Sequence, residues 1–186
     1  MKNRYHLIKQ RVINFLTPSP TLWEEIVICN ERIVAKKLKK DRGCYLQFGA
    51  GLPSVSGFYN GVKKFDSELN YNMYIFDTFT GPPMDNIFKN DKKSLNFKDD
   101  IEYRKMWNHG GYKKFKKDLI NLNVKEGIFD LIVGPISETT KNFVIPKNET
   151  VGIVNIDLGS RSYTVVLEVL EFLKPHLENF TLIFFD

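Results

Sequence analysis

The sequence predicts an α/β fold, a three-layer sandwich with a mostly parallel sheet between helices. Five short, nearly continuous apolar runs alternate with segments whose apolar residues recur at helical spacing. Continuous apolar runs are typical of strands that helices cover on both faces. Strands that alternate with helices pair in parallel, because each helical crossover returns the chain to the same end of the sheet. The predicted strands cover residues 44–48, 73–76, 129–133, 151–156 and 180–185.

The predicted helices follow from apolar residues three and four positions apart. The first begins at Thr21, with Glu24 three residues later in the pattern of a capping box, and it runs to about residue 40. Pro53 suits the first turn of the second helix, which runs to about residue 65. Two more helices are expected at 112–122 and 162–173, and a short helix or loop at 137–148.

The chain of 186 residues, 42% of them hydrophobic, is long enough for one domain with a sizeable core. We expect residues 1–20 to be an N-terminal extension and residues 21–186 to be a single domain. The stretch 84–111 is long, rich in lysine and low in periodic pattern. Two interpretations stay open for it, a floppy insertion and a lid over a ligand.

Charge and cysteine content narrow the class of protein. The net charge is +5, and lysines gather at 36–40 and 113–117. Such runs are usually solvated helix faces, although a basic surface also suits nucleic acid or an anionic substrate. No apolar run approaches the roughly 20 residues of a membrane helix, and no signal peptide is evident. Cys29 and Cys44 lie in apolar surroundings, so we expect free thiols and a cytoplasmic protein.

A glycine turn follows the first predicted strand, and an acid follows the second. The turn is Gly49-Ala50-Gly51 and the acid is Asp77. Glycines let a backbone approach a ligand closely, and a carboxylate accepts hydrogen bonds from ribose hydroxyls, so the pair indicates a Rossmann-like, nucleoside-binding fold. An NAD-dependent dehydrogenase shares both features but is less favoured, because Ser54 occupies the third glycine position of that fingerprint.

Aspartates follow three of the five predicted strands. They are Asp77, Asp157 and Asp186. Each alone could cap a turn, but the carboxyl ends of parallel strands share one edge of the sheet, where ligands bind. Asp157 and Asp186 would follow later, neighbouring strands, and two carboxylates suit Mg²⁺. The sequence contains no zinc spacing of Cys and His, no P-loop and no Gly-x-Ser-x-Gly elbow.

One motif resembles a known family. Residues 76–83, Phe-Asp-Thr-Phe-Thr-Gly-Pro-Pro, resemble the Phe-Asp-Ser-Phe-Glu-Gly-Leu-Pro motif of the macrocin O-methyltransferase family, the TylF-like class I S-adenosylmethionine-dependent methyltransferases. Residues 43–49 are similar to that family's Gly-x-Phe-Val-Glu-x-Gly opening, and residues 151–157 and 183–186 are similar to its later blocks. The resemblance covers roughly residue 24 to the C-terminus.

The resemblance implies a class I methyltransferase fold and transfer of a methyl group from S-adenosyl-L-methionine to a hydroxyl oxygen on a small molecule or sugar. Asp157 and Asp186 would be the metal ligands, with Mg²⁺ as the metal. Phe79 would pack near the adenine or belong to the core. The cofactor-binding residues that it implies are Gln47, Gly49, Gly51, Asp77, Thr78 and Phe79.

The chain also departs from the family pattern. Gln47 stands where the family has an acid, Pro53 where a second glycine is usual, and Gly159 where the second acid of an Asp-x-Asp block is usual. The family's last strands have no counterpart before the sequence ends at Asp186.

A second hypothesis is therefore a degenerate, non-catalytic domain that binds a nucleoside or a partner, and a third is a piece of a longer enzyme. A nucleic-acid partner is less favoured, because no base-reading motif is present. The acceptor, the catalytic residue and the oligomeric state stay open.

Overall fold

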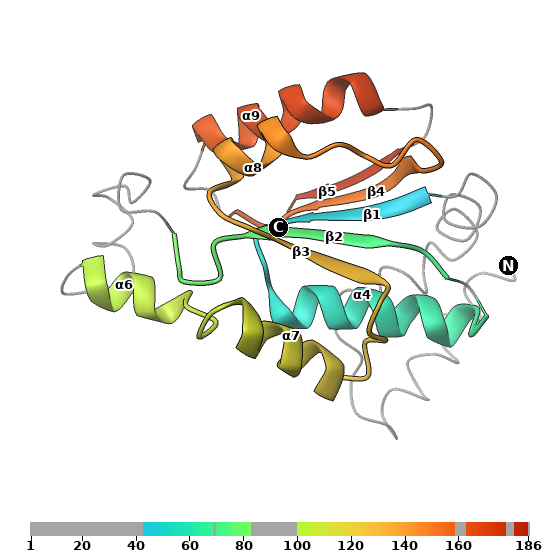
Figure 1. The fold of residues 1–186 in the computed structure, drawn as a ribbon, viewed down its shortest axis with the longest axis horizontal. Coiled ribbons are helices and arrows are strands. Elements are labelled where there is room, and N and C mark those ends of the chain that lie inside the picture. The colour runs from blue at the N-terminus through green and yellow to red at the C-terminus, as the bar shows by residue number, and fades with distance from the viewer. Residues whose placement is uncertain (1–42, 69, 83–99, 159–162, 178–180, 186) are drawn as a thin grey trace, which may run out of the picture.

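The chain forms a five-stranded parallel sheet with helices on both faces (Figure 1). The computed structural model describes residues 43–68, 70–82, 100–158, 163–177 and 181–185. Neighbouring strands follow the order β3-β2-β1-β4-β5, so the first strand lies at the centre. The strands are β1 Gly43–Phe48, β2 Met73–Asp77, β3 Phe129–Val133, β4 Thr150–Ile156 and β5 Leu182–Phe185. The predicted α/β fold with its parallel sheet is confirmed.

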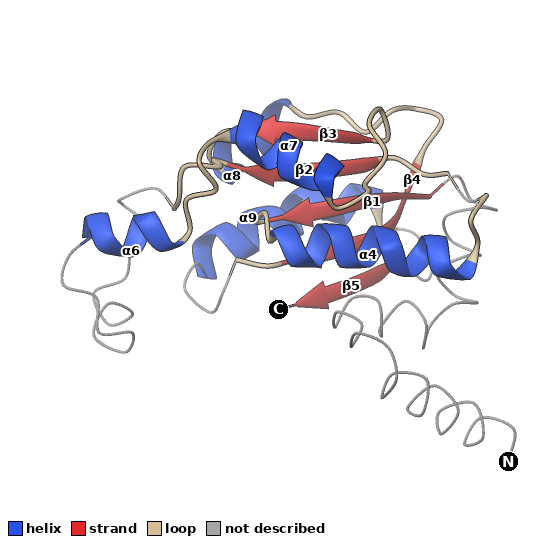
Figure 2. Ribbon diagram, turned by 90° about the horizontal axis from the view of Figure 1, so that it is seen from below, coloured by secondary structure: helices blue, strands red, loops and turns tan. Residues whose placement is uncertain are grey.

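Two helices cover each face of the sheet (Figures 1 and 2). One face carries α4 Leu52–Phe65 and α7 Tyr112–Asn121. The other carries α8 Ile136–Asn142 and α9 Tyr163–Leu173, which continues into the 3₁₀ turn η3 Lys174–His176. A further helix, α6 Asp100–Met106, lies at the end of the molecule toward which the strands point (Figure 2). Of the described helices, none combines the length and apolar character needed to cross a bilayer.

The sequence-based boundaries need one correction. The weak pattern of 84–111 predicts no regular structure, but residues 100–106 form α6. A helix of 7 residues has only about two turns, too few for apolar residues to repeat over the longer window in which a helical pattern is recognised. The short element expected within 137–148 is the helix α8. The expected extension 1–20 and helix 21–40 lie outside the described residues.

The centre of the core is an aromatic contact between β1 and α4. Tyr45 stacks on Phe58 with ring centroids 4.2 Å apart, and both are fully buried. Val55, Tyr59 and Val62 complete the buried stripe of α4 at the predicted helical spacing. Removing a buried aromatic ring of this kind costs about 3–5 kcal/mol of folding free energy, so this contact anchors the helix that follows the glycine turn.

The opposite face of β1 packs against α8 and α9. Cys44, Leu46 and Phe48 alternate with Tyr45 along the strand and belong to this second core cluster. Phe48 stacks on Phe76 of β2 at 4.7 Å and meets Phe172 of α9 at 6.1 Å. Both faces of β1 are thus buried, as its continuous apolar run predicts.

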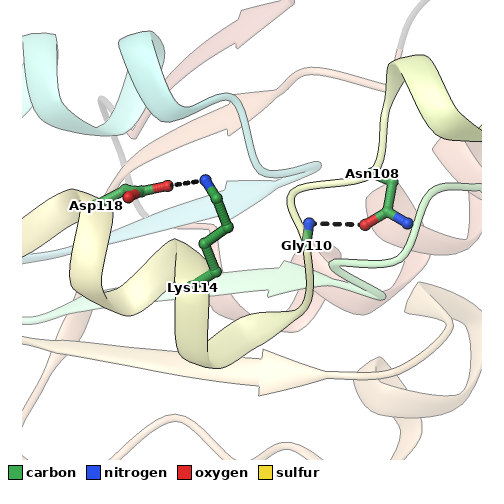
Figure 3. Close-up of polar contacts among 4 residues, drawn as sticks. All are labelled: Asn108, Gly110, Lys114 and Asp118. Atoms are coloured by element: carbon green, nitrogen blue, oxygen red, sulfur yellow. Dashed lines mark hydrogen bonds and ion pairs between the residues drawn. The ribbon is translucent and has the colours of Figure 1, made fainter.

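The turn before α7 and the first residues of this helix are polar (Figure 3). Asn108 Oδ1 accepts a hydrogen bond from the Gly110 N–H at 2.7 Å, and Lys114 pairs with Asp118 one helical turn away. The lysines of 113–117 are exposed, whereas Phe115 between them is buried. The interpretation of this lysine run as a solvated helix face is confirmed; the run at 36–40 lies outside the described residues.

Cys44 lies at the start of β1, near Glu149 and Tyr74 at the end of the sheet opposite the glycine turn. It is a free, fully buried thiol. Burial raises the pKa of the Cys44 thiol from 9.0 to about 12, and the Glu149 carboxylate adds to the rise. The thiolate is the reactive form, so the folded chain protects Cys44 chemically as well as sterically.

In a Cys29→Ser variant, we expect Cys44 to react with a thiol reagent at pH 8 about a thousandfold more slowly in native buffer than in urea. The reason is that a pKa of about 12 in place of 9.0 lowers the thiolate fraction by that factor. Stopped-flow labelling across a urea series measures both rates, and circular dichroism verifies that the variant is folded. Equal rates in the two conditions would contradict the burial of Cys44.

Candidate functional site

The candidate site lies where the chain leaves the carboxyl ends of β1, β2 and β4. β1 pairs with β2 on one side and with β4 on the other, so the strand order reverses direction here. Backbone hydrogen bonds extend both pairings past the strands: Gly49 N–H donates to Phe76 O at 2.9 Å and Asp157 N–H to Phe48 O at 2.8 Å. Open α/β sheets bind ligands at such a reversal.

One peptide unit of the glycine turn is held at both ends by side chains. The carbonyl oxygen of Gly49 accepts a hydrogen bond from Gln47 Nε2 at 2.6 Å. The N–H of Ala50, on the other side of the same peptide bond, donates to Asp77 Oδ2 at 2.8 Å. Residues of β1 and β2 therefore fix the orientation of the Gly49–Ala50 peptide together.

Gln47 is a fully buried member of a polar network. Its Oε1 accepts hydrogen bonds from the Tyr45 hydroxyl and from Asn155 Nδ2, the latter at 2.9 Å. Gln47 and Asn155 are register partners on β1 and β4. The predicted cofactor-binding residue Gln47 therefore lies behind the turn, with its amide turned to the protein interior.

Asp77 lies at the tip of β2 and is half-buried. Its Oδ2 accepts the Ala50 N–H and its Oδ1 accepts the Phe79 N–H. Thr78 stabilises the same loop by donating its hydroxyl to Gly81 O at 2.6 Å. The structure thus brings Asp77 to the glycine turn, whereas the hydrogen bond from Thr78 to Gly81 lies within the loop that follows β2.

Phe79 has its side chain in the core. Its ring is fully buried, and its centroid lies 5.1 Å from that of Phe115. Of the two roles expected for Phe79, packing near an adenine or belonging to the core, the structure shows the second. Its φ of 58° is left-handed, which is uncommon for a residue other than glycine. The Asp77 carboxylate accepts the Phe79 N–H and so supports this conformation.

Close contacts surround both glycines of the turn, with backbone atoms at Gly49 and with side-chain atoms at Gly51. Gly49 has a φ of +85°, and a Cβ there would lie 2.0 Å from the backbone oxygen of Asp157. A Cβ at Gly51 would lie 2.7 Å from Asp157 Oδ2 and 2.8 Å from Ser54 Oγ. At Gly49 a side chain would therefore collide with the backbone that follows β4.

Asp157 follows β4 and turns its carboxylate toward the glycine turn. Ser54 Oγ, in the first turn of α4, donates to Asp157 Oδ2 at 3.4 Å. The sequence pairs Asp157 with Asp186 as metal ligands, and their strands β4 and β5 are indeed neighbours. Asp186 and Gly159 lie outside the described residues. Within the described part of the chain, no three His, Cys, Asp or Glu residues gather closely enough to hold a metal ion.

Part of the 84–111 stretch lies against the Asp77 loop. The backbone of Arg104 in α6 approaches Gly81 so closely that a Cβ on that glycine would lie 2.5 Å from Arg104 O. Gly111 N–H donates to Phe79 O at 3.0 Å, just before α7 begins. The motif at 76–83 therefore packs against residues that follow it by more than 20 positions.

No family model and no curated protein matches this chain. Solved structures do match. CalS11, a calicheamicin methyltransferase, is 20% identical with a TM-score of 0.59, and the match covers 95% of this chain and 75% of CalS11. The apo structure of CalS11, described as a TDP-rhamnose 3′-O-methyltransferase, gives 19% identity and a TM-score of 0.54 over the same shares. The O-methyltransferase NovP is 14% identical with a TM-score of 0.57, over 81% of this chain and 60% of NovP.

The chain has the fold of these O-methyltransferases. At identities of 14–20%, the likeness establishes the fold alone. The chain spans 60% of the length of NovP and 75% of that of CalS11. The methyltransferase fold that the motif at 76–83 implies is therefore confirmed at the level of architecture.

Sequence reasoning did not identify Asn155 or the peptide that Gln47 and Asp77 hold. The one signal for Asn155 is a polar residue inside the otherwise apolar run 151–156. A fully buried amide within a strand favours a hydrogen-bond partner nearby, and Gln47 on β1 accepts one hydrogen bond from Asn155 Nδ2.

A pair of glycine substitutions separates backbone strain from steric conflict at the turn. Gly127 has a φ of +88°, close to that of Gly49, but nothing lies within 4 Å of the position that a Cβ would take there. We expect Gly127→Ala to cost about 1–2 kcal/mol from strain alone, and Gly49→Ala to cost clearly more because of Asp157 O. Urea unfolding measures both free energies; equal losses would show that the contact with Asp157 is unimportant.

Proposed function

We propose that the chain binds S-adenosyl-L-methionine and transfers its methyl group to a hydroxyl oxygen of a small molecule or sugar. The observation that carries the proposal is the position of Asp77: its carboxylate is half-buried at the tip of β2 and tied to the glycine turn through Ala50. The fold shared with O-methyltransferases and the motif at 76–83 support the same activity.

Asp77 retains capacity to bind a ribose. A carboxylate offers roughly four lone-pair positions. Two backbone N–H groups, those of Ala50 and Phe79, occupy one position on each oxygen. The Thr78 hydroxyl lies 3.5 Å from Oδ1, but its one proton is directed at Gly81 O, which is 2.6 Å away. The remaining positions can accept the two hydroxyls of a ribose, and the two N–H bonds hold the carboxylate in place beforehand. Such preorganisation lowers the entropic cost of binding.

The glycine turn suits the methionine part of the cofactor. Gly49 lets the turn pass close to the backbone of Asp157, so the turn and the Asp157 carboxylate lie side by side at the edge of the sheet where open α/β folds bind ligands. When bound, S-adenosylmethionine supplies a methyl group on a positively charged sulfur, so that its C–S bond breaks as the acceptor oxygen forms a C–O bond and loses its proton. The protein must then align the acceptor and remove that proton, and alignment alone supplies several kcal/mol.

We propose Asp157 and Asp186 as ligands of a Mg²⁺ ion beside the turn. The Asp157 carboxylate is partly exposed and has the oxygen chemistry that Mg²⁺ prefers. A divalent ion at this position would lower the pKa of the acceptor hydroxyl and favour loss of its proton. The sugar acceptor named for CalS11 supports the choice of a hydroxylated acceptor.

A second candidate is a non-catalytic domain that binds the cofactor or its product. The sequence Asp157-Leu158-Gly159 favours it, because the resembled family has a second acid at the third position. The two candidates share the binding of S-adenosylhomocysteine and differ in methyl transfer, so binding and transfer are measured separately.

Binding of S-adenosylhomocysteine, measured by isothermal titration calorimetry, tests the shared step. We expect the unaltered chain to bind and Asp77→Ala to lose at least tenfold in affinity, because the ribose partner and the Ala50 hydrogen bond both disappear. Asp130→Asn is the control, since it removes an exposed acid of β3. No binding by the unaltered chain at millimolar ligand would refute both candidates.

Metal binding is tested with Mn²⁺ as a paramagnetic substitute for Mg²⁺. We expect electron paramagnetic resonance to detect bound Mn²⁺ in the unaltered chain and in Asp130→Asn, and at least tenfold weaker binding in Asp157→Asn.

Methyl transfer to TDP-rhamnose, followed as release of S-adenosylhomocysteine, should then rise with Mg²⁺. Transfer that is unaffected by a chelator would contradict the metal proposal, and binding without transfer to any hydroxylated acceptor would favour the non-catalytic domain.

A further inference from the structure

We infer that Gln47 and Asn155 are positioning residues that hold the Gly49–Ala50 peptide in its binding orientation from inside the sheet. The inference rests on the proposed function, since it concerns the turn that would receive the cofactor. It gives Gln47 a role different from that of an acid which contacts the cofactor directly.

The chemistry of the contacts fixes how the Gln47 amide points. The Gly49 carbonyl can only accept a hydrogen bond, so the Gln47 atom 2.6 Å from it must be the NH₂ nitrogen. The Gln47 oxygen then faces two donors, the Tyr45 hydroxyl and Asn155 Nδ2. Reversing the amide would place two oxygens against each other at Gly49 and two NH₂ groups against each other at Asn155.

Asn155 acts through Gln47. It is fully buried, and its Nδ2 donates to the Gln47 oxygen from the neighbouring strand. Its own Oδ1 has no hydrogen-bond partner among the described residues. A buried amide with an unpaired oxygen costs folding free energy that an apolar residue would not. Its contribution is therefore the hydrogen bond to Gln47, which holds the amide plane in place.

The pair acts on the same peptide bond as Asp77. Gln47 holds the carbonyl end and Asp77 holds the N–H end, so rotation of this peptide would break both hydrogen bonds. An ionised glutamate at position 47 could not donate to the Gly49 carbonyl and would repel it. The amide at this position therefore suits a turn that is held from behind.

Hydrogen exchange of the Ala50 amide tests the inference without any ligand. We expect Gln47→Leu to speed Ala50 exchange at least tenfold relative to the Met73 amide, which bonds to Ile128 O at the opposite end of β2. Asn155→Leu should act in the same direction but add little to Gln47→Leu in the double variant. Tyr74→Phe is the matched control, because it removes a hydrogen bond of 2.9 Å to Glu149 at the far end of the sheet.

Binding of S-adenosylhomocysteine supplies the second readout. Gln47→Leu should bind about tenfold more weakly than the unaltered chain, whereas Tyr74→Phe should bind equally well even if its melting temperature falls. Unchanged Ala50 exchange in Gln47→Leu would overturn the positioning role. Absence of binding by the unaltered chain, with Ala50 exchange altered in the variant, would instead refute the proposed function alone.

Gln47→Glu adds a pH-dependent readout that a mere change in packing would not produce. A protonated glutamate can donate its O–H to the Gly49 carbonyl, and an ionised one cannot. Burial disfavours the ionised form, so we expect Ala50 protection and ligand affinity to be retained at pH 5.5 and lost as the pH rises to 9. Gln47→Leu, measured at the same pH values, is the control for effects of pH that do not involve the side chain at position 47. A Gln47→Glu profile parallel to that of Gln47→Leu would overturn the inference.

Discussion

The candidate site depends on one peptide bond, between Gly49 and Ala50, at the centre of the sheet. Gln47 holds its carbonyl and Asp77 holds its N–H, from two different strands. The backbone of Asp157, directly after β4, the third of these strands, lies so close to Gly49 that no side chain fits there. Three strand ends therefore meet at a point where only glycine is tolerated. The glycine at position 49 is therefore a consequence of how the strands pack.

Asp77 combines a structural contribution with the proposed binding role. Its carboxylate accepts the N–H groups of Ala50 and Phe79 and thereby joins the glycine turn to the loop after β2. Charge-assisted hydrogen bonds of this kind are stronger than neutral ones. The same bonds keep the carboxylate from rotating. A carboxylate that is to accept hydrogen bonds from two ribose hydroxyls must hold one orientation. Stability and the proposed ribose binding therefore depend on the same carboxylate, and measurements on variants of Asp77 must separate the two.

The fold could be predicted because its signals are local. Apolar runs marked all five strands, and the turn and the acid at the strand ends could be located from residues 49–51 and 77 alone. The direction of a side chain at the site is not a local property. Gln47 points to the interior because Asn155, 108 residues later in the chain, is its partner across the sheet. Phe79 enters the core because Phe115 lies beneath it. Such contacts follow from strand register, which no single stretch of sequence encodes.

Gln47 stands where the resembled family has an acid, and its contacts are those of a residue that supports the turn. Asp77 and Asp157 already flank β1 at its carboxyl end, and their contacts place both beside the glycine turn. A third carboxylate, fully buried at position 47, would repel both and would lack a donor for the Gly49 carbonyl. A neutral amide avoids the repulsion and supplies that donor. In the proposed site, the amide at position 47 therefore supports the turn, and Asp77 and Asp157 would supply the negative charge that hydroxyls and cations require.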